Sequence, residues 1–271
     1  MKLGLGSYAY AWAIGGVSGC NPERPMDAFA FIDRAMELGV RLVQIADNIP
    51  LHGLSQVERD SLLARAQRLG LAIEVGTRGI GQDHLRTYLH IAGEFGSPIL
   101  RTVIDSDDYH PSMGEIIETL CAVLPEFESA GITLAVENHD RFTAREFRHI
   151  VEQVRSPNIG ICLDTVNSFG ALEGPEVVVD TLGPCMVNLH IKDFSIRRAS
   201  YVMGFVVEGT AAGHGRLNIP WLLDRLQRHG RDFNAILETW PPPAATLADT
   251  IQRENEWAAT SIAYLRTLIP E

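Results

Sequence analysis

The sequence has few cysteines, no long apolar run and no excess of positive charge. Four cysteines occur in 271 residues, none at the spacing of a zinc or redox motif, so we interpret them as buried thiols in a reducing cytoplasm. No apolar run reaches the roughly 18 residues of a membrane-spanning helix, and no secretory leader is evident. The net charge of −11 argues against nucleic acid as the partner.

A glycine-rich phosphate loop is also absent. The GVSG and GTAAGHG segments contain glycine, but neither joins a strand to a helix as a phosphate-binding or dinucleotide-binding loop does. We therefore expect a substrate without a phosphate group.

Strand-like and helix-like segments alternate along the whole chain. This alternation predicts a parallel sheet covered by helices. Eight such units in 271 residues favour an α/β fold of the (β/α)8 TIM barrel type over a doubly wound open sheet. The composition, with 46% hydrophobic and 21% charged residues, is that of an ordinary globular protein and shows no internal break. We expect one domain over residues 1–271.

The elements follow from apolar periodicity and from turn residues. The expected strands are Leu3–Tyr8, Leu42–Ala46, Leu71–Gly76, Ile99–Ile104, Ile132–Glu137, Ile159–Asp164, Met186–Ile191 and Asn234–Thr239. The expected helices are Met26–Leu38, Ser55–Leu69, Gln82–Phe95, Ser112–Ala130, Thr143–Val154, Pro175–Leu182, Pro220–His229 and Leu247–Leu268. Capping boxes begin the helices at Ser55 and Thr143. Ala9–Pro25 and Asp193–Arg216 are predicted to be loops, the second at the active site.

Four residues of metal-ligand type lie at the ends of the last four strands: Glu137, Asp164, His190 and Glu238. Because parallel barrel strands end at the same mouth, these side chains are expected to meet there. Side chains alternate between the two faces of a strand. In each of the four strands this alternation puts the polar residue toward the barrel axis and the branched apolar residues, Val187 among them, toward the helices.

Three buried carboxylates at one mouth would repel one another, and each would lose its hydration. A divalent cation removes both problems, and oxygen-rich ligand sets suit hard divalent ions. Four independent, solvated polar residues at strand ends are the alternative. The shared alternation in all four strands favours the metal site.

At these residues the chain resembles the xylose isomerase-like superfamily of TIM barrels, the sugar phosphate isomerase/epimerase group. The family's ENH-like, strand-end Asp and HxKD-like segments match Glu137-Asn138-His139, Asp164 and His190-Ile191-Lys192-Asp193, and Glu238 closes the last strand. The resemblance implies that Glu137, Asp164, His190 and Glu238 bind one divalent ion, with Mn²⁺ expected first and Mg²⁺ or Co²⁺ as alternatives. Endonuclease IV, another member, is disfavoured by the acidic charge and by the lack of a full set of additional ligands.

The resemblance implies an isomerase or epimerase that acts on a small keto-sugar or sugar-acid derivative through a metal-stabilised enediolate. Glu137 and Glu238 would then exchange a proton on opposite faces of the substrate. Lys192 shares the face of His190 and could protonate a leaving hydroxyl or hold a carboxylate, which favours a lyase, either a dehydratase or a decarboxylase. The alternative for Lys192 is a salt bridge with Glu208 or Asp193. A non-catalytic carbohydrate-binding barrel is the third reading.

Five residues are candidates for contacts with the substrate: Arg101, His139, Asn167, Trp240 and Trp12. Arg101 could instead form a structural ion pair with Glu74, and Trp12 could pack in the core. Asn167 stands where family members often have a histidine. We expect a small polyhydroxy carbonyl compound as the partner, without nucleic acid or membrane, and a homodimer or homotetramer is compatible with this reading.

Overall fold

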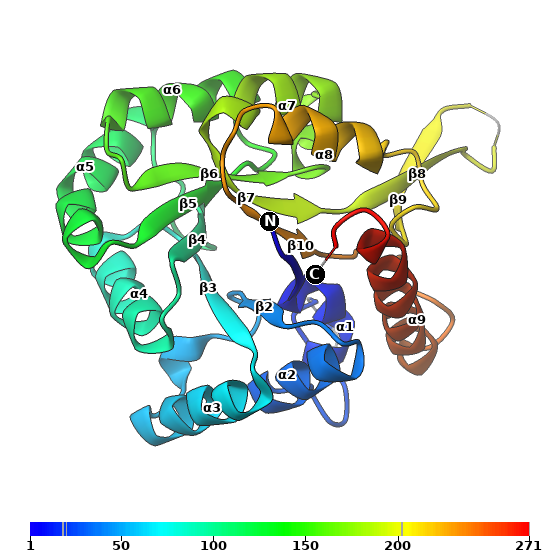
Figure 1. The fold of residues 1–271 in the computed structure, drawn as a ribbon. Coiled ribbons are helices and arrows are strands. Elements are labelled where there is room, and N and C mark those ends of the chain that lie inside the picture. Colours follow the sequence, from blue (N-terminus) through cyan, green and yellow to red (C-terminus); the bar gives the residue numbers. More distant parts are fainter. Residues whose placement is uncertain (18, 20, 202, 271) are drawn as a thin grey trace.

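The computed structural model describes residues 1–17, 19, 21–201 and 203–270, so Cys20 lies outside the described residues. In these ranges, eight parallel strands close into a barrel in the order β1-β10-β7-β6-β5-β4-β3-β2 (Figure 1). The predicted (β/α)8 barrel is therefore confirmed. The barrel strands are β1 Leu3–Gly6, β2 Leu42–Ile45, β3 Ala72–Arg78, β4 Ile99–Val103, β5 Thr133–Glu137, β6 Ile159–Asp164, β7 Met186–Ile191 and β10 Asn234–Leu237.

Helices surround the barrel (Figure 1). They are α1 Ala11–Ile14, α2 Ala28–Glu37, α3 Gln56–Leu69, α4 Gln82–Phe95, α5 Met113–Ala130, α6 Ala144–Val154, α7 Pro175–Leu182, α8 Ile219–Gln227 and α9 Leu247–Arg266. Short 3-10 turns are η1 Ser7–Tyr10, η2 Leu51–Gly53, η3 Asn167–Ala171 and η4 Gly183–Cys185. The capping boxes at Ser55 and Thr143 are present as predicted, and Ser112 begins another that was not recognised. None of the described helices is long and apolar enough to cross a membrane.

The segment after β1 differs from the prediction. Ala9–Pro25 was expected to be a loop, but it contains α1 and the second half of η1. The carboxylate of Glu254, in α9, accepts hydrogen bonds from the backbone N–H groups of Trp12 at 2.8 Å and Ala13 at 2.9 Å. Because the first N–H groups of a helix have no partner within it, this distant carboxylate stabilises a helix that local sequence does not predict.

The predicted loop Asp193–Arg216 is largely an antiparallel hairpin. Its strands, β8 Asp193–Arg198 and β9 Phe205–Thr210, pair from Asp193 with Thr210 to Arg198 with Phe205. Figure 1 shows the hairpin projecting from the barrel. A salt bridge of 2.8 Å joins Arg197 to Glu208 across the two strands. The glycine-rich tail of the segment led the sequence prediction away from this short strand pair.

An apolar cluster fills part of the barrel interior. It is made of Ile99, Ala135 and Cys162, and Val187 packs against it. Val187 was expected to face the helices. The pairing of β6 with β7 shifts register at Ile161 and Cys162, and such an irregularity changes where the neighbouring side chains point. The expected facing of Val187 is therefore wrong.

The cysteines depart in part from the prediction of buried thiols. Cys162 is buried and Cys185 is half-buried, but Cys121 is exposed on α5. The prediction is wrong for Cys121, because the outer face of an amphipathic helix also accommodates a small thiol.

Candidate active site

The structure brings the four strand-end residues together at one mouth of the barrel. Nδ1 of His190 lies 3.4 Å from Oε2 of Glu137, 3.9 Å from Oδ2 of Asp164 and 3.5 Å from Oε1 of Glu238. All four side chains are buried, with at most 1% of their surface exposed. The parallel strands thus place three carboxylates around one imidazole nitrogen.

The arrangement of the ligand-type atoms in this cluster fits a divalent cation. Within the described residues, Nδ1 of His190, Oδ2 of Asp164 and both carboxylate oxygens of Glu238 are buried without a hydrogen bond. Buried acceptors without a donor are unfavourable. One potential ligand atom from each of these three residues lies within 4.8 Å of the others, a spacing that allows a single metal ion to contact all three.

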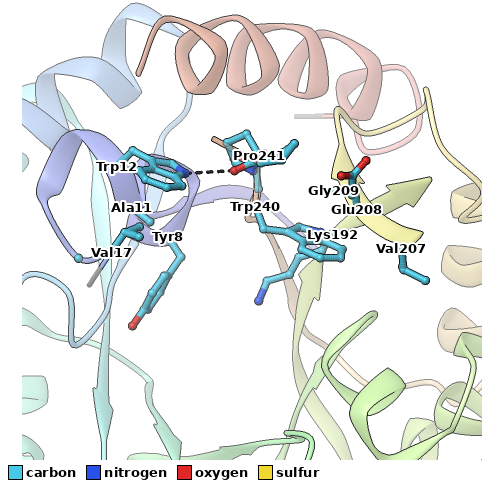
Figure 2. Close-up of a pocket in the computed structure, with 13 residues that line it drawn as sticks. Tyr8, Ala11, Trp12, Val17, Lys192, Val207, Glu208, Gly209, Trp240 and Pro241 are labelled. Carbon is cyan, nitrogen blue, oxygen red and sulfur yellow. Dashed lines mark hydrogen bonds between the residues drawn. The ribbon is translucent and has the colours of Figure 1, made fainter. Parts of the chain in front are cut away.

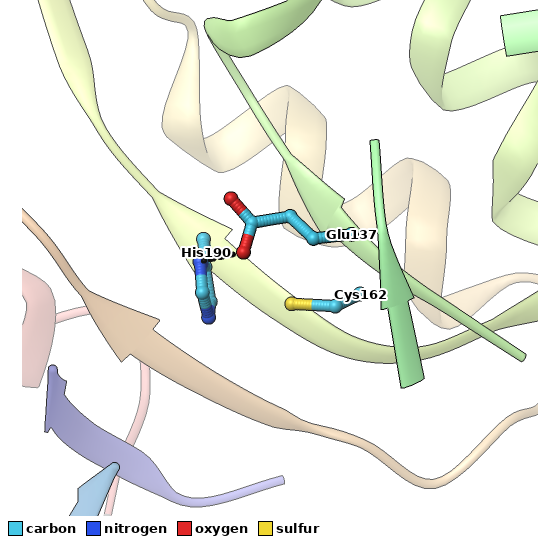
Figure 3. A group of neighbouring side chains, drawn as sticks. All are labelled: Glu137, Cys162 and His190. Atoms are coloured by element: carbon cyan, nitrogen blue, oxygen red, sulfur yellow. Dashed lines mark ion pairs between the residues drawn. The ribbon is translucent and has the colours of Figure 1, made fainter. Parts of the chain in front are cut away.

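Cys162 also lies close to two members of the cluster. A ligand atom of Cys162 is within 4.8 Å of one in Glu137 and one in His190 (Figure 3). Its Sγ donates to Oδ1 of Asn188 at 3.5 Å. Burial, reinforced by the nearby Glu137 carboxylate, raises the pKa of the thiol well above its ordinary value. Since thiolate is the form that binds metal, Cys162 is a weaker candidate than the carboxylates.

Lys192 contacts two members of the cluster. Its Nζ forms ion pairs with Oδ2 of Asp164 and with Oε2 of Glu238, each at 2.9 Å. The angles at these two carboxylate oxygens do not meet the geometry of a hydrogen bond. Burial opposes the charge, but these carboxylates raise the pKa of Lys192 above its ordinary value. The predicted alternative, a salt bridge with Glu208 or Asp193, is wrong. Glu208 pairs with an arginine of the hairpin, and Asp193 accepts backbone N–H groups.

Arg101 and Asn167 hold Glu137 from two sides. Nε of Arg101 donates to Oε2 of Glu137, and Nδ2 of Asn167 donates to Oε1 at 2.7 Å. Burial opposes ionisation of Glu137, but the positive charges around it, that of Arg101 foremost and that of Lys192 among the others, together keep the pKa of the carboxyl group well below its ordinary value. Arg101 also donates to Asp47 at 3.1 Å. Its predicted alternative partner, Glu74, is therefore wrong.

A cavity of about 430 Å³ lies next to Lys192. Trp12 and Trp240, both predicted to contact substrate, line it, and Nε1 of Trp12 donates to the carbonyl oxygen of Pro241 at 3.1 Å. Figure 2 shows Tyr8 and Lys192 extending toward the same space. A second cavity of about 310 Å³ is also lined by Lys192 and Trp240, and by Asn167, which was predicted to contact the substrate. The aromatic walls and the ammonium group suit a small polar molecule.

His139 is a partly exposed residue that pairs with its neighbour Asp140. Strand β5 ends at Glu137, as predicted, so His139 follows the strand. Its side chain is 37% exposed, and Nδ1 lies 2.5 Å from Oδ1 of Asp140. His139 lines neither of the two cavities.

Sequence reasoning missed several polar residues of the first three barrel strands and the segment after β1. Tyr8 donates to Asp47 at 2.8 Å, and Arg78 donates to it at 3.1 Å, so both support the carboxylate that holds Arg101. Oε1 of Gln44 lies 2.7 Å from Nε2 of His190. Their inward position in the strand alternation was the available signal. Metal-ligand residue types alone do not single out a glutamine, a tyrosine or an arginine at these positions.

The closed barrel and the ligand cluster at its mouth are the features expected of the family that the sequence resembles. Residues 32–268 match the family model described as xylose isomerase-like TIM barrel. The chain therefore belongs to this family, and the resemblance inferred from the sequence is confirmed.

The chain is also similar to one curated relative in sequence and to two solved structures in fold. It is 34% identical over 270 residues to the 3-oxo-isoapionate decarboxylase of Pectobacterium atrosepticum, covering 100% of this chain and 97% of the relative. A D-psicose 3-epimerase structure determined with D-fructose has a TM-score of 0.73 at 17% identity, covering 100% of both chains. A xylose isomerase-like barrel of Mycobacterium smegmatis in complex with magnesium has a TM-score of 0.64 at 16% identity, covering 87% of this chain and 90% of that one.

Proposed function

We propose that this protein is a divalent-metal-dependent lyase that removes CO₂ from a small 3-oxo sugar acid. The observation that carries the proposal is the ammonium group of Lys192, held 2.9 Å from both Asp164 and Glu238 beside the cavity. Lys2 and Lys192 are the only lysines in the sequence, and the side chain of Lys192 is only 13% exposed. The relative that decarboxylates 3-oxo-isoapionate, similar along the whole chain, supports the same substrate class.

The chemistry of a 3-oxo acid matches this arrangement. Its ketone is β to the carboxylate, so when the C–C bond to the carboxylate breaks, the electron pair moves to the ketone oxygen and CO₂ leaves. The resulting enolate or enediolate then takes a proton on the carbon that carried the carboxylate. The reaction requires positive charge near the ketone oxygen and one proton donor, but no base that removes a C–H proton.

Glu137, Asp164, His190 and Glu238 would hold the metal ion, with Mn²⁺ expected first and Mg²⁺ or Co²⁺ as alternatives. When bound, the ion acts as a Lewis acid toward the substrate's carbonyl oxygen and neighbouring hydroxyl group. Lys192 stabilises the negative charge that develops on the substrate and donates the proton. Trp12 and Trp240 limit the access of water, which strengthens these charge interactions.

The isomerase or epimerase is the second candidate, favoured by the position of Glu137 and Glu238 at the same ligand cluster. An exchange base must be free to take a proton from carbon. Both oxygens of Glu137 are held by Arg101 and Asn167, and Glu238 is paired with Lys192. These contacts favour the lyase over the epimerase.

A substrate screen in deuterated water tests the proposal. The purified protein with Mn²⁺ is given 3-oxo-isoapionate and, in parallel, D-psicose and D-fructose, and the products are read by mass spectrometry and NMR. We expect CO₂ release from the acid, with a single deuterium in the product. Deuterium exchange into a ketohexose without CO₂ release would instead establish the epimerase. Binding without any turnover would establish the carbohydrate-binding barrel.

A further inference from the structure

We propose that Gln44 and Glu74 are positioning residues that fix the proton of His190 on Nε2, so that Nδ1 presents its lone pair to the metal centre. The inference rests on the metal centre of the proposed function. It concerns two residues that do not belong to the ligand cluster, one of which does not contact any of the four ligands.

A buried hydrogen-bond chain runs from His190 across the barrel interior to Glu74. Nε2 of His190 lies 2.7 Å from Oε1 of Gln44. Nε2 of Gln44 donates to Oε2 of Glu74 and to Oδ1 of Asn188, each at 3.1 Å. Each of these side chains is at most 2% exposed, so water does not compete for the bonds.

The contacts of Glu74 determine which groups in this chain donate hydrogen bonds and which accept them. Its Oε2 also accepts from Nδ2 of Asn188 at 3.0 Å, and its Oε1 accepts from Nδ2 of Asn234 at 2.7 Å. Within the described part of the chain, every hydrogen bond to this carboxyl group comes from an amide N–H. Burial raises the pKa of Glu74 above its ordinary value, whereas these three amide donors favour the ionised carboxylate, which only accepts hydrogen bonds. Each amide must therefore turn its NH₂ group toward Glu74.

The orientation of Gln44 then determines the tautomer of His190. With its NH₂ group on Glu74 and Asn188, Gln44 can offer His190 only its carbonyl oxygen, so Nε2 must carry the proton. A neutral imidazole has one N–H, which leaves a lone pair on Nδ1. Nδ1 is the buried nitrogen without a hydrogen bond that faces the three carboxylates. A proton on Nδ1 would occupy the position of the ion.

The strand register builds this arrangement into the fold. Gln44 of β2 is paired in register with Glu74 of β3, and Asn188 of β7 with Asn234 of β10. Four inward-facing residues from two separate strand pairs therefore meet in the barrel interior. A hydrogen bond to the second nitrogen of a ligating histidine orients the ring, and its loss lowers metal affinity about 10–100-fold.

The variant Glu74→Gln tests the inference with almost no change of shape. Its amide can donate to Oε1 of Gln44, which lets Gln44 turn its NH₂ group toward His190. We expect ¹⁵N NMR of the histidine-labelled, metal-free protein to show a proton on Nδ1 of His190. We also expect calorimetric titration to show about 10–100-fold weaker Mn²⁺ binding. Gln44→Met, which removes the acceptor and keeps the volume, is expected to weaken Mn²⁺ binding in the same range.

Glu254→Gln is the matched control, because Glu254 is a buried glutamate that accepts from backbone N–H groups in another part of the protein. Its Mn²⁺ affinity and its His190 tautomer are expected to match the wild type. An unchanged tautomer and an unchanged affinity in folded Glu74→Gln or Gln44→Met would overturn the inference. Failure of the wild type to bind Mn²⁺ would refute the metal centre, while the tautomer of the metal-free protein would still test the role of the network.

Discussion

At the scale of single residues, the proposed chemistry depends on the charge of Lys192. Lys192→Met removes the ammonium group while keeping a similar length. Because the proton donor is lost, we expect the rate of CO₂ release to fall by about 10²–10⁴. Lys192→Arg, which retains the charge but not the proton transfer, is expected to bind substrate and turn it over slowly.

Lys2→Met is the control for the Lys192 variants, since Lys2 is an exposed lysine near the N-terminus. Its turnover is expected to equal that of the wild type. A Lys192→Met protein with circular dichroism and turnover like the wild type would remove the main support for the lyase.

A second residue-scale prediction concerns Glu254, which is fully buried. Burial raises its pKa from the ordinary 4.5 to about 7, against the opposing effect of two backbone hydrogen bonds. A pKa that is higher in the folded protein than in the unfolded chain means that protonation favours folding. This stabilisation is complete below about pH 4.5, and it is lost as the pH rises through 7.

Glu254→Gln removes this pH-dependent contribution. We expect the unfolding free energy of the wild type to fall by roughly 3 kcal/mol relative to that of the variant when the pH rises from 4.5 to 7.5. Urea denaturation at several pH values measures it, with exposed Glu256→Gln on the same helix as the control. A difference that does not vary with pH would contradict the assigned pKa.

At the scale of elements, strand β1 passes so close to the ligand cluster that the residue at position 6 has no room for a side chain. A Cβ atom at Gly6 would lie 2.9 Å from Cγ of Glu238 and 3.1 Å from its Oε1. Gly6→Ala is therefore expected to displace this carboxylate and to weaken Mn²⁺ binding at least ~10-fold in a calorimetric titration.

Gly93 offers the matching substitution in a different environment. A Cβ atom there meets nothing within 4 Å, and the residue lies inside α4. Gly93→Ala should leave Mn²⁺ binding unchanged and stabilise the fold by roughly 0.5–1 kcal/mol. Equal metal affinities for the two alanine variants would show that Glu238 does not need the space at Gly6.

The elements also show what the sequence could and could not predict. Barrel strands and outer helices follow from local periodicity, and the convergence of the strand-end ligands follows from parallel topology. Helix α1 depends on Glu254, which is distant in the sequence, and the inward position of Val187 depends on a register shift. The partners of Arg101 and Lys192 depend on which inward side chains face each other across the barrel. Local sequence patterns do not contain these tertiary relations.

At the scale of the whole molecule, a ligand that binds only the folded chain stabilises it. Removal of metal with a chelator should leave a folded barrel, and Mn²⁺ at about 100 times its dissociation constant should add about 2.7 kcal/mol to the free energy of unfolding. We expect a rise in the melting temperature on the order of 5–10 °C, measured by calorimetry. The variant Asp164→Asn should respond much less, and an equal response would place the ion elsewhere.

The most direct test is a crystal structure of the protein grown with Mn²⁺, with anomalous scattering recorded to locate the ion. The proposed metal centre predicts one peak about 2.0–2.6 Å from Nδ1 of His190 and from oxygens of Glu137, Asp164 and Glu238. Nε2 of His190 should remain bonded to Gln44. The absence of a peak among these four residues, or a peak bound to Nε2, would contradict it.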